Sequence, residues 1–277
     1  MLLLKPTVIV VSNDAFSSAL EHIDGMKHLN TTEIPVFVKV GIYNSETGIC
    51  TTVQTLQSIV DSFDKAPSIR VTESDSGAGP GLKRLEIWEE CYNDRVVPFN
   101  LSEDTDTKDV VITGESVPFP RVFSEPNTFI STHVPRRYEE AGLEDLMNLG
   151  FVIKNLLGMI PDTKKHRFHK HLTTALLDIY EAIGGIDLAV IDATHVYLGF
   201  KKKRITVTPN LLIVGTDAFA VEAVGGYLVG FEPAEMPVLQ EARKRGLGET
   251  SLDRIEIIGD LDSERETISH AFDRLKS

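Results

Sequence analysis

The segment Phe151–His171 collects positive charge in a chain that is acidic overall. It contains five Lys and Arg residues and three of the eight histidines against a single acid, Asp162, whereas the whole chain has a formal net charge of −13. Lysine, arginine and amide side chains form strong hydrogen bonds to phosphate and carboxylate groups. The segment is therefore predicted to bind a small anion, and the expected ligand-binding residues are Lys154, Asn155, Lys164 and Arg167.

The first half of this segment places polar side chains in apolar surroundings. The apolar spacing predicts a largely buried helix over Leu143–Ile160, and Lys154 and Asn155 interrupt its apolar run. A buried amide must find hydrogen-bond partners. Burial would also lower the pKa of the lysine.

The second half, Lys164–His171, is predicted to begin another helix after Pro161. Positive charge at a helix start opposes the helix dipole, which favours anions there. Either a bound ligand or the acidic stretch Glu103–Asp109 could compensate, and the simplest alternative is a solvated basic face. His169 is a candidate acid or base at this site.

Polar residues also follow four predicted strands. The stretches after these strands begin with Lys39, with Glu73-Ser74-Asp75-Ser76-Gly77, with Asp192-Ala193-Thr194-His195 and with Gly215-Thr216-Asp217. In open α/β sheets, ligands bind beyond the carboxyl ends of the strands, so these residues would converge on one rim if the strands share a sheet. Lys39 and Ser76 are expected to bind the ligand, and Asp75 is a second candidate acid or base.

Three of these strand-end residues are aspartates. Asp75, Asp192 and Asp217 could together bind Mg²⁺ or a similar divalent cation, because such ions prefer carboxylate oxygens. A divalent metal is therefore a candidate cofactor, although the cofactor itself stays unknown. The alternative is structural, since Asp and Ser at strand–helix junctions cap helices and stabilise them by about 1 kcal/mol each.

The elements that must position these residues alternate between strands and helices. Apolar runs of strand length occur at Val8–Val11, Val36–Val40, Ile69–Thr72, Leu188–Ile191, Leu211–Val214 and Ile255–Ile258. Helical spacing lies between them, over Thr52–Phe63, Leu82–Tyr92, Leu143–Ile160, Leu172–Ile183, Ala218–Leu228, Val238–Arg245 and Glu264–Leu275. This order predicts an α/β fold with a mainly parallel sheet flanked by helices. We expect one domain over residues 1–277, with an irregular β insertion or small lobe at 93–135.

Composition limits the class of protein. Hydrophobic residues make up 42% and charged residues 25%, which is typical of a globular domain. Cys50 and Cys91 form no C-x-x-C pattern, so a cytoplasmic protein without an iron–sulfur cluster in this chain is expected. The negative charge disfavours nucleic acid as a partner, and no apolar run reaches the roughly 18 residues that span a bilayer.

Several motifs resemble a known family, the "domain of unknown function 362", whose members are sometimes fused to iron–sulfur ferredoxin domains. The clearest are VIKNLLGMIPDTKKHRFH, DLAVIDAT, GTDAFAVEAVGGYLVG and RGLGETSLDRIEIIG, within a resemblance from about Val36 to Gly259. The family typically has Lys-Pro-Asn where this chain has Lys39-Val40-Gly41. The resemblance implies an α/β fold and no particular reaction. It favours as site residues Lys39, Asp75, Lys154, Asn155, Lys164, His169, Asp192 and Asp217.

Three functional hypotheses follow. The first is an enzyme or binding protein for a small anionic ligand, held at the carboxyl ends of the strands. The second is a non-catalytic docking module for an acidic redox or iron–sulfur protein, motivated by the family's fusions. The third is a scaffold without activity whose basic residues balance local acids. A concave, desolvated cluster would favour the first and a flat exposed patch the second. A homo-oligomer is compatible with all three.

Overall fold

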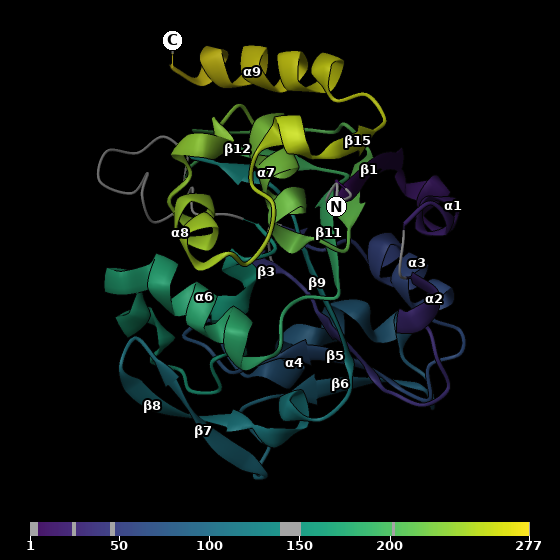
Figure 1. Cartoon of the computed structure of the whole chain (residues 1–277), viewed down its shortest axis with the longest axis vertical. Helices are drawn as coiled ribbons and strands as arrows, with labels where there is room; N and C mark the ends of the chain where they lie inside the picture. Colours follow the sequence, from purple (N-terminus) through teal and green to yellow (C-terminus); the bar gives the residue numbers. More distant parts are fainter. Residues whose placement is uncertain (1–4, 24–25, 45–47, 139–150, 201–202, 277) are drawn as a thin grey trace.

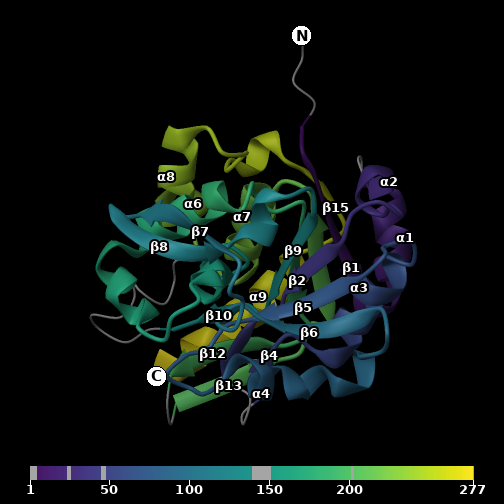
Figure 2. The same cartoon turned by 90° about the horizontal axis from the view of Figure 1, so that it is seen from below.

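The computed structural model describes residues 5–23, 26–44, 48–138, 151–200 and 203–276 of the chain. Its centre is an eight-stranded sheet in the order β15-β1-β14-β11-β9-β2-β5-β6 (Figures 1 and 2). The strands are β1 (Thr7–Ser12), β2 (Val36–Lys39), β5 (Ile69–Glu73), β6 (Val96–Asn100), β9 (Thr128–His133), β11 (Leu188–Ala193), β14 (Leu211–Gly215) and β15 (Glu256–Ile258).

Most neighbouring strands in this sheet run parallel, as the sequence predicted. The pairs β15–β1, β11–β9, β9–β2, β2–β5 and β5–β6 are parallel. Only β14 runs antiparallel to its neighbours β1 and β11. The predicted α/β fold is therefore confirmed, with one reversed strand in the sheet.

Successive side chains of each strand point to opposite faces of the sheet, and each face carries its own apolar layer. In β2, Val36 and Val38 pack with Leu56 on one face, whereas Phe37 packs with Phe129 on the other. The first face is covered by α1 (Phe16–Glu21), α2 (Met26–Leu29), α3 (Val53–Ser62) and α4 (Gly81–Leu85). On the second face α7 (Ala218–Leu228) packs directly on β11 and β14, and α6 (Leu172–Ala182), α8 (Pro237–Arg245) and α9 (Asp262–Lys276) belong to the same apolar cluster. Burial on both faces explains why these strands lack alternating polarity.

The smaller elements lie around this sheet. Strands β7 (Thr107–Ile112) and β8 (Glu115–Pro120) form a hairpin at the lower edge of Figure 1. Within residues 93–135, β6 and β9 belong to the main sheet, so this hairpin is the part that stands apart. Two further small sheets pair β3 (Ile42–Asn44) with β4 (Ile49–Cys50), and β10 (Arg136–Arg137) with β12 (Val196–Phe200) and β13 (Lys203–Val207).

The segment 151–171 does not form the α-helix that the apolar spacing predicts. Residues 143–150 of that expected helix lie outside the described residues, and the remainder forms two 3-10 helices, η4 (Lys154–Met159) and η5 (Lys165–His171). The carboxylate of Glu222 on α7 accepts hydrogen bonds from the backbone N–H groups of Phe151 and Ile153. Tertiary hydrogen bonds therefore replace regular helical ones at the start of this segment.

One other predicted helix, Leu82–Tyr92, is divided into two shorter ones. The α4 helix ends at Leu85 and a 3-10 helix, η2, covers Glu86–Cys91. Among the helices that the structure describes, none is long and apolar enough to cross a bilayer.

Candidate functional site

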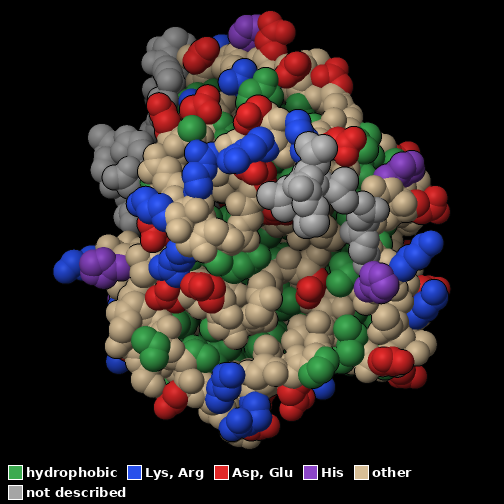
Figure 3. All heavy atoms as spheres, viewed as in Figure 1, with side chains coloured by type: hydrophobic (Ala, Val, Ile, Leu, Met, Phe, Trp, Pro, Cys, Tyr) green, Lys and Arg blue, Asp and Glu red, His purple; other side chains and the backbone are tan. Residues whose placement is uncertain are grey.

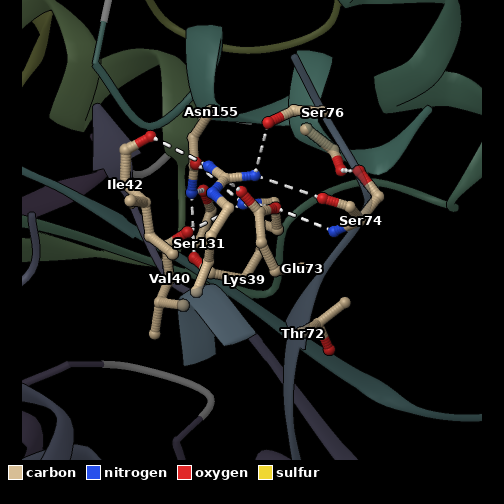
Figure 4. A network of polar contacts seen from close by, with 12 residues as sticks. Lys39, Val40, Ile42, Thr72, Glu73, Ser74, Ser76, Ser131 and Asn155 are labelled. Carbon is tan, nitrogen blue, oxygen red and sulfur yellow. Dashed lines mark hydrogen bonds and ion pairs between the residues drawn. The ribbon is translucent and has the colours of Figure 1, made fainter. Parts of the chain in front are cut away.

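Lys39 is the centre of a buried polar network at the carboxyl end of β2 (Figure 4). Its side chain is 1% exposed, and its Nζ lies 2.8 Å from Oε2 of Glu73. The same Nζ donates to the backbone oxygen of Val40 at 2.7 Å and to Oδ1 of Asn155 at 3.2 Å. Three acceptors match the three ammonium protons. Burial lowers the pKa of Lys39, and the Glu73 carboxylate opposes this shift.

Glu73 is shared between two cations. Its Oε1 lies 2.7 Å from Nη2 of Arg84, while Oε2 also accepts the backbone N–H of Ser74 at 3.1 Å. Nη1 of Arg84 donates to the Ser74 carbonyl at 3.2 Å and to Oγ of Ser76 at 3.0 Å. Buried ions persist where hydrogen bonds satisfy them on several sides. One carboxylate against two cations nevertheless leaves this network positively charged.

Asn155 joins β2 to β9 through its amide. While Oδ1 accepts from Lys39, Nδ2 donates to the backbone oxygens of Lys39 at 2.9 Å and Thr132 at 3.1 Å. The side chain is buried, and the partners it needs are supplied by the ends of two parallel strands. The 3-10 helix that carries Asn155 is thereby fixed over the sheet edge.

A pocket of about 160 Å³ opens beside this network. Among the residues that the structure describes, its lining contains five cationic side chains and one carboxylate. The lining residues are Lys39, Ile42, Tyr43, Glu73, Ser76, Arg84, His133, Arg136, Lys154, Asn155, Leu157, Gly158 and Lys165.

Arg136 is the most unusual charge in this lining because it is buried, at 7% exposure. Its guanidinium carbon lies 4.1 Å from the ring centroid of Tyr43, and its Nη1 donates to the hydroxyl of Tyr138 at 3.3 Å. No carboxylate forms an ion pair with Arg136 in the part of the chain that the structure describes. The guanidinium of Arg136 therefore contacts an aromatic ring and a phenol hydroxyl, whereas a buried cation usually contacts an anion.

The lysines of the pocket lose much of their usual basicity. Burial, followed by the charge of Arg136, lowers the pKa of Lys154 to about 7. Burial also lowers the pKa of Lys165 to about 8, with Lys39 and Arg84 adding to the shift and Glu73 opposing it. Both amines therefore hold their protons less tightly than exposed lysines do.

His133, at the end of β9, is a neutral ring in this environment. Burial and then the charges of Arg136, Lys39 and Lys154 hold its pKa well below the ordinary value. Its Nδ1 accepts the backbone N–H of Val134 at 2.8 Å, which places the single ring proton on Nε2. The ring therefore offers one N–H donor in the pocket wall.

Two glycines allow these side chains to approach the backbone. A Cβ on Gly158 would lie 2.7 Å from Cε of Lys39 and 3.1 Å from Oε2 of Glu73. A Cβ on Gly41 would lie 2.4 Å from Nδ1 of His133. Separations this short require a shift of the neighbouring side chain, so both positions need glycine in the present arrangement.

The structure brings some of the predicted ligand-binding residues together and leaves others on the surface. Lys39, Ser76, Lys154 and Asn155 line the pocket. Lys164 is exposed, and its neighbour Lys165 occupies the pocket wall instead, donating from Nζ to Oγ of Ser74.

Arg167 and His169 also lie away from the pocket lining. Arg167 forms ion pairs with Glu115 at 2.7 Å and Asp162 at 2.8 Å. His169 has its Nδ1 3.0 Å from the backbone oxygen of His166. Acids from the β7–β8 hairpin and from the turn before η5 therefore balance this part of the basic segment.

The structure does not bring the three predicted metal ligands together. Asp217 and Asp192 lie at opposite ends of the strands, because β14 runs antiparallel to β11. Asp75 follows β5, three strands from β11, which corresponds to about 14 Å at the usual strand spacing. Among the described residues, no group of three His, Cys, Asp or Glu side chains is arranged to hold a metal ion.

Each of these aspartates instead binds neighbouring donors. Asp75 accepts from the backbone N–H of Gly81 at 2.7 Å and from Nδ2 of Asn100 at 2.9 Å. The other two aspartates bind the starts of helices. Asp192 accepts from the N–H and hydroxyl of Thr52, at 2.7 and 2.8 Å, and Asp217 accepts from three backbone N–H groups, those of Phe219, Ala220 and Glu249. Asp217 is the N-cap of α7, in line with the capping interpretation, whereas Asp192 binds Thr52, the N-cap residue of α3.

Several pocket residues were not proposed from the sequence, namely Glu73, Arg84, His133, Arg136 and Lys165. Glu73 follows the same predicted strand as Asp75, and His133 follows an apolar run in the middle region, so the strand-end rule points to both. Arg84 and Arg136 gave no such signal, because only the packing of α4 and β10 carries them to the pocket.

Comparison with known families agrees with the resemblance seen in the motifs. Residues 36–226 match the family described as "Domain of unknown function (DUF362)", which is more than half of the chain. The chain therefore belongs to the DUF362 family. No curated protein matches it significantly.

Proposed function

We propose that this DUF362 protein binds a small anionic ligand, through a phosphate or carboxylate group, at the carboxyl ends of β2, β5 and β9. The observation that carries this proposal is the charge of the pocket lining, which among the described residues is five cationic side chains against the carboxylate of Glu73. A charge removed from water is costly unless an opposite charge or hydrogen bonds compensate it. A bound anion would provide that compensation.

The donors available to such a ligand are of several kinds. Arg136 offers a planar guanidinium that suits bidentate contact with carboxylate or phosphate. Lys154 and Lys165 offer ammonium groups whose lowered pKa values would rise towards the ordinary range beside an anion. The Nε2–H of His133 adds a neutral donor.

The docking hypothesis receives less support from the arrangement of charges. The candidate site is a pocket with buried cations, which favours a small molecule over a protein surface. Arg167, the arginine of the basic segment, is already paired with acids. On the face shown in Figure 3, Lys and Arg side chains lie among Asp and Glu side chains. Binding to an acidic redox protein and binding of a divalent metal both stay predictions.

Calorimetric titration with sulfate tests the proposal, because this tetrahedral dianion resembles phosphate and does not titrate near neutral pH. The sharpest comparison uses adjacent lysines. Lys165→Met removes a charge from the pocket wall, whereas Lys164→Met removes an equal charge from the exposed surface next to it. We expect the first change to weaken sulfate binding about tenfold or more, in line with the loss of one charge-assisted hydrogen bond.

The control, Lys164→Met, should leave the affinity within about twofold of the unchanged protein, since exposed charges interact weakly through water. Equal losses in both variants would show that sulfate responds only to net charge. The absence of sulfate binding to the unchanged protein, followed by the absence of phosphate binding, would contradict the proposal.

A further inference from the structure

The cations of the pocket fall into two groups on opposite sides of β2. The β5-side group consists of Lys165 and Arg84. Lys165 donates to Ser74, the residue directly after β5, and α4, which carries Arg84, packs against β5 and β6. The β9-side group consists of Arg136 and Lys154. Arg136 lies three residues after the end of β9, and η4, which begins with Lys154, packs against β9.

The Lys39–Glu73 ion pair lies between the two groups. In the sheet order β9-β2-β5, Lys39 at the end of β2 occupies the middle position and is ion-paired with Glu73. Because neighbouring strands are about 4.8 Å apart, the ends of β9 and β5 are separated by roughly 10 Å. Side chains that converge from both sides shorten the gap that a ligand would have to span.

The charges that act on Lys154 and Lys165 agree with this division. The charge of Arg136 acts on Lys154, whereas those of Lys39 and Arg84 act on Lys165. The β9-side group also contains the buried guanidinium, for which no carboxylate partner occurs among the described residues.

Resting on the proposed function, we infer that the ligand is a compact molecule with two separated anionic groups, one contacting Arg136 on the β9 side and the other contacting Lys165 on the β5 side. Each group is a carboxylate or a phosphate, and a short uncharged linker crosses the Lys39–Glu73 pair. A ligand with one anionic group would compensate one side of the pocket only. Joining two groups makes the second contact intramolecular, which raises affinity without any new kind of contact.

A ligand series tests this inference on the unchanged protein. The affinities of acetate, malonate, succinate and glutarate, measured by calorimetry at one ionic strength, separate the number of anionic groups from their spacing. We expect the best dicarboxylate to bind at least about tenfold more tightly than acetate. Phosphonoacetate, which carries one phosphonate and one carboxylate, should exceed malonate and succinate if one side of the pocket prefers phosphate.

Variants then assign the two groups to the two sides. Lys165→Met should reduce the best dicarboxylate to nearly the affinity of acetate, and Arg136→Gln should do the same from the opposite side. Lys164→Met serves as the matched control and should preserve the preference for dicarboxylates. Thermal unfolding of each variant shows whether the pocket is still folded, and the ligand series on the unchanged chain does not depend on any variant.

Equal affinities for acetate and all dicarboxylates would overturn the inference, and so would a dicarboxylate preference that survives Lys165→Met. Sulfate separates this failure from failure of the proposed function. If sulfate binds and responds to Lys165→Met while the dicarboxylates show no advantage, the anion site stands and the two-group ligand is wrong. If none of these anions binds, both proposals fail.

Discussion

The ends of β2 and β14 show two ways in which polar residues can be used at a strand end. Beyond β14, the carboxylate of Asp217 accepts hydrogen bonds from three backbone N–H groups, at 3.0, 3.0 and 2.9 Å. Beyond β2, Lys39 and its neighbours leave an excess of buried positive charge around a pocket. The first arrangement completes a helix cap. In the second, Glu73 is one carboxylate against five cationic side chains among the described lining residues.

The difference teaches that residue type and position at a strand end do not identify a site. The useful distinction is whether the partners of each charge are already present. Asp217 and Asp192 have their donors within the fold. Arg136 has an aromatic ring and a phenol but no carboxylate in the described part of the chain. The predictions below test this contrast, beginning with the largest expected effect.

The largest effect should come from Glu73→Gln, which removes the carboxylate that pairs with Lys39 and Arg84. Lys39 and Arg84 would then be buried without an opposite charge, and breaking a buried ion pair in this way costs about 3–5 kcal/mol. We expect the free energy of unfolding, measured in denaturant, to fall by that amount. Added sulfate should recover part of the loss, because it binds only the folded protein.

A loss below about 1 kcal/mol would show that the lysine and arginine find water or other acceptors instead. The exposed pair between Arg121 and Asp106 provides the reference, because surface ion pairs contribute about 0–1 kcal/mol. Asp106→Asn should therefore have little effect on unfolding.

Gly158→Ala should have the next largest effect. The added Cβ would come within 2.7 Å of Cε of Lys39, so the Lys39–Glu73 pair must move. Overpacking of this kind costs about 1–3 kcal/mol. We expect a lower free energy of unfolding together with weaker sulfate binding, which denaturation and calorimetry would measure on the same sample.

The control for that change is Gly77→Ala, because a Cβ there would meet nothing within 4 Å. It should alter neither quantity. If Gly158→Ala behaves like this control, the close packing of η4 on Lys39 is not required for the pocket.

Asp217→Ala should affect stability and leave anion binding unchanged. The substitution removes the N-cap of α7 and one contact to Glu249, with an expected loss of about 1–2 kcal/mol in the free energy of unfolding. Because Asp217 lies at the opposite ends of the strands from the pocket, the sulfate affinity should stay within about twofold. A clear loss of affinity would mean that the two strand ends are coupled.

The last prediction concerns the pH dependence of sulfate affinity. The cationic forms of Lys154 and Lys165 bind the anion, and their pKa values without it are about 7 and about 8. Sulfate affinity should therefore fall as pH rises above 7, by up to about tenfold per pH unit for each lysine that must take up a proton. Calorimetry from about pH 6 to about pH 9 would measure this slope.

Stability should change with pH in the opposite direction. Because the folded-state pKa of Lys154 lies below the ordinary value of 10.5, the unfolded chain binds more protons between about 7 and 10.5. The contribution of Lys154 to the free energy of unfolding therefore rises with pH across that window and is lost as pH falls towards 7. The difference between the unchanged protein and Lys154→Met isolates this contribution, and a flat difference would contradict the lowered pKa.

The strands and most of the helices could be predicted from sequence because burial imposes simple patterns. Val36, Val38 and Phe37 fill opposite faces of the sheet and together produce an uninterrupted apolar run. The direction of β14 could not be predicted, because an uninterrupted apolar run is compatible with both parallel and antiparallel pairing. Because β14 is reversed, Asp217 lies at the opposite ends of the strands from Lys39 and not beside it as expected.

The site was predicted in part for similar reasons. Lys39 and Asn155 could be recognised because a strand end and a polar side chain inside an apolar segment are both local features. The choice of Lys164 instead of Lys165 failed to match the pocket lining, since 3-10 geometry and the hydrogen bond to Ser74 decide which lysine turns inward. Arg136 depends on the packing of β10 against β12, which joins residues far apart in sequence.

The most direct measurement is a crystal structure of the protein in complex with selenate, in which the anomalous signal of selenium locates the anion. We expect one strong peak in the pocket at the ends of β2, β5 and β9, within hydrogen-bonding distance of Arg136 or Lys165. Selenium peaks only on the outer surface, with the pocket filled by ordered water, would contradict the proposed anion site.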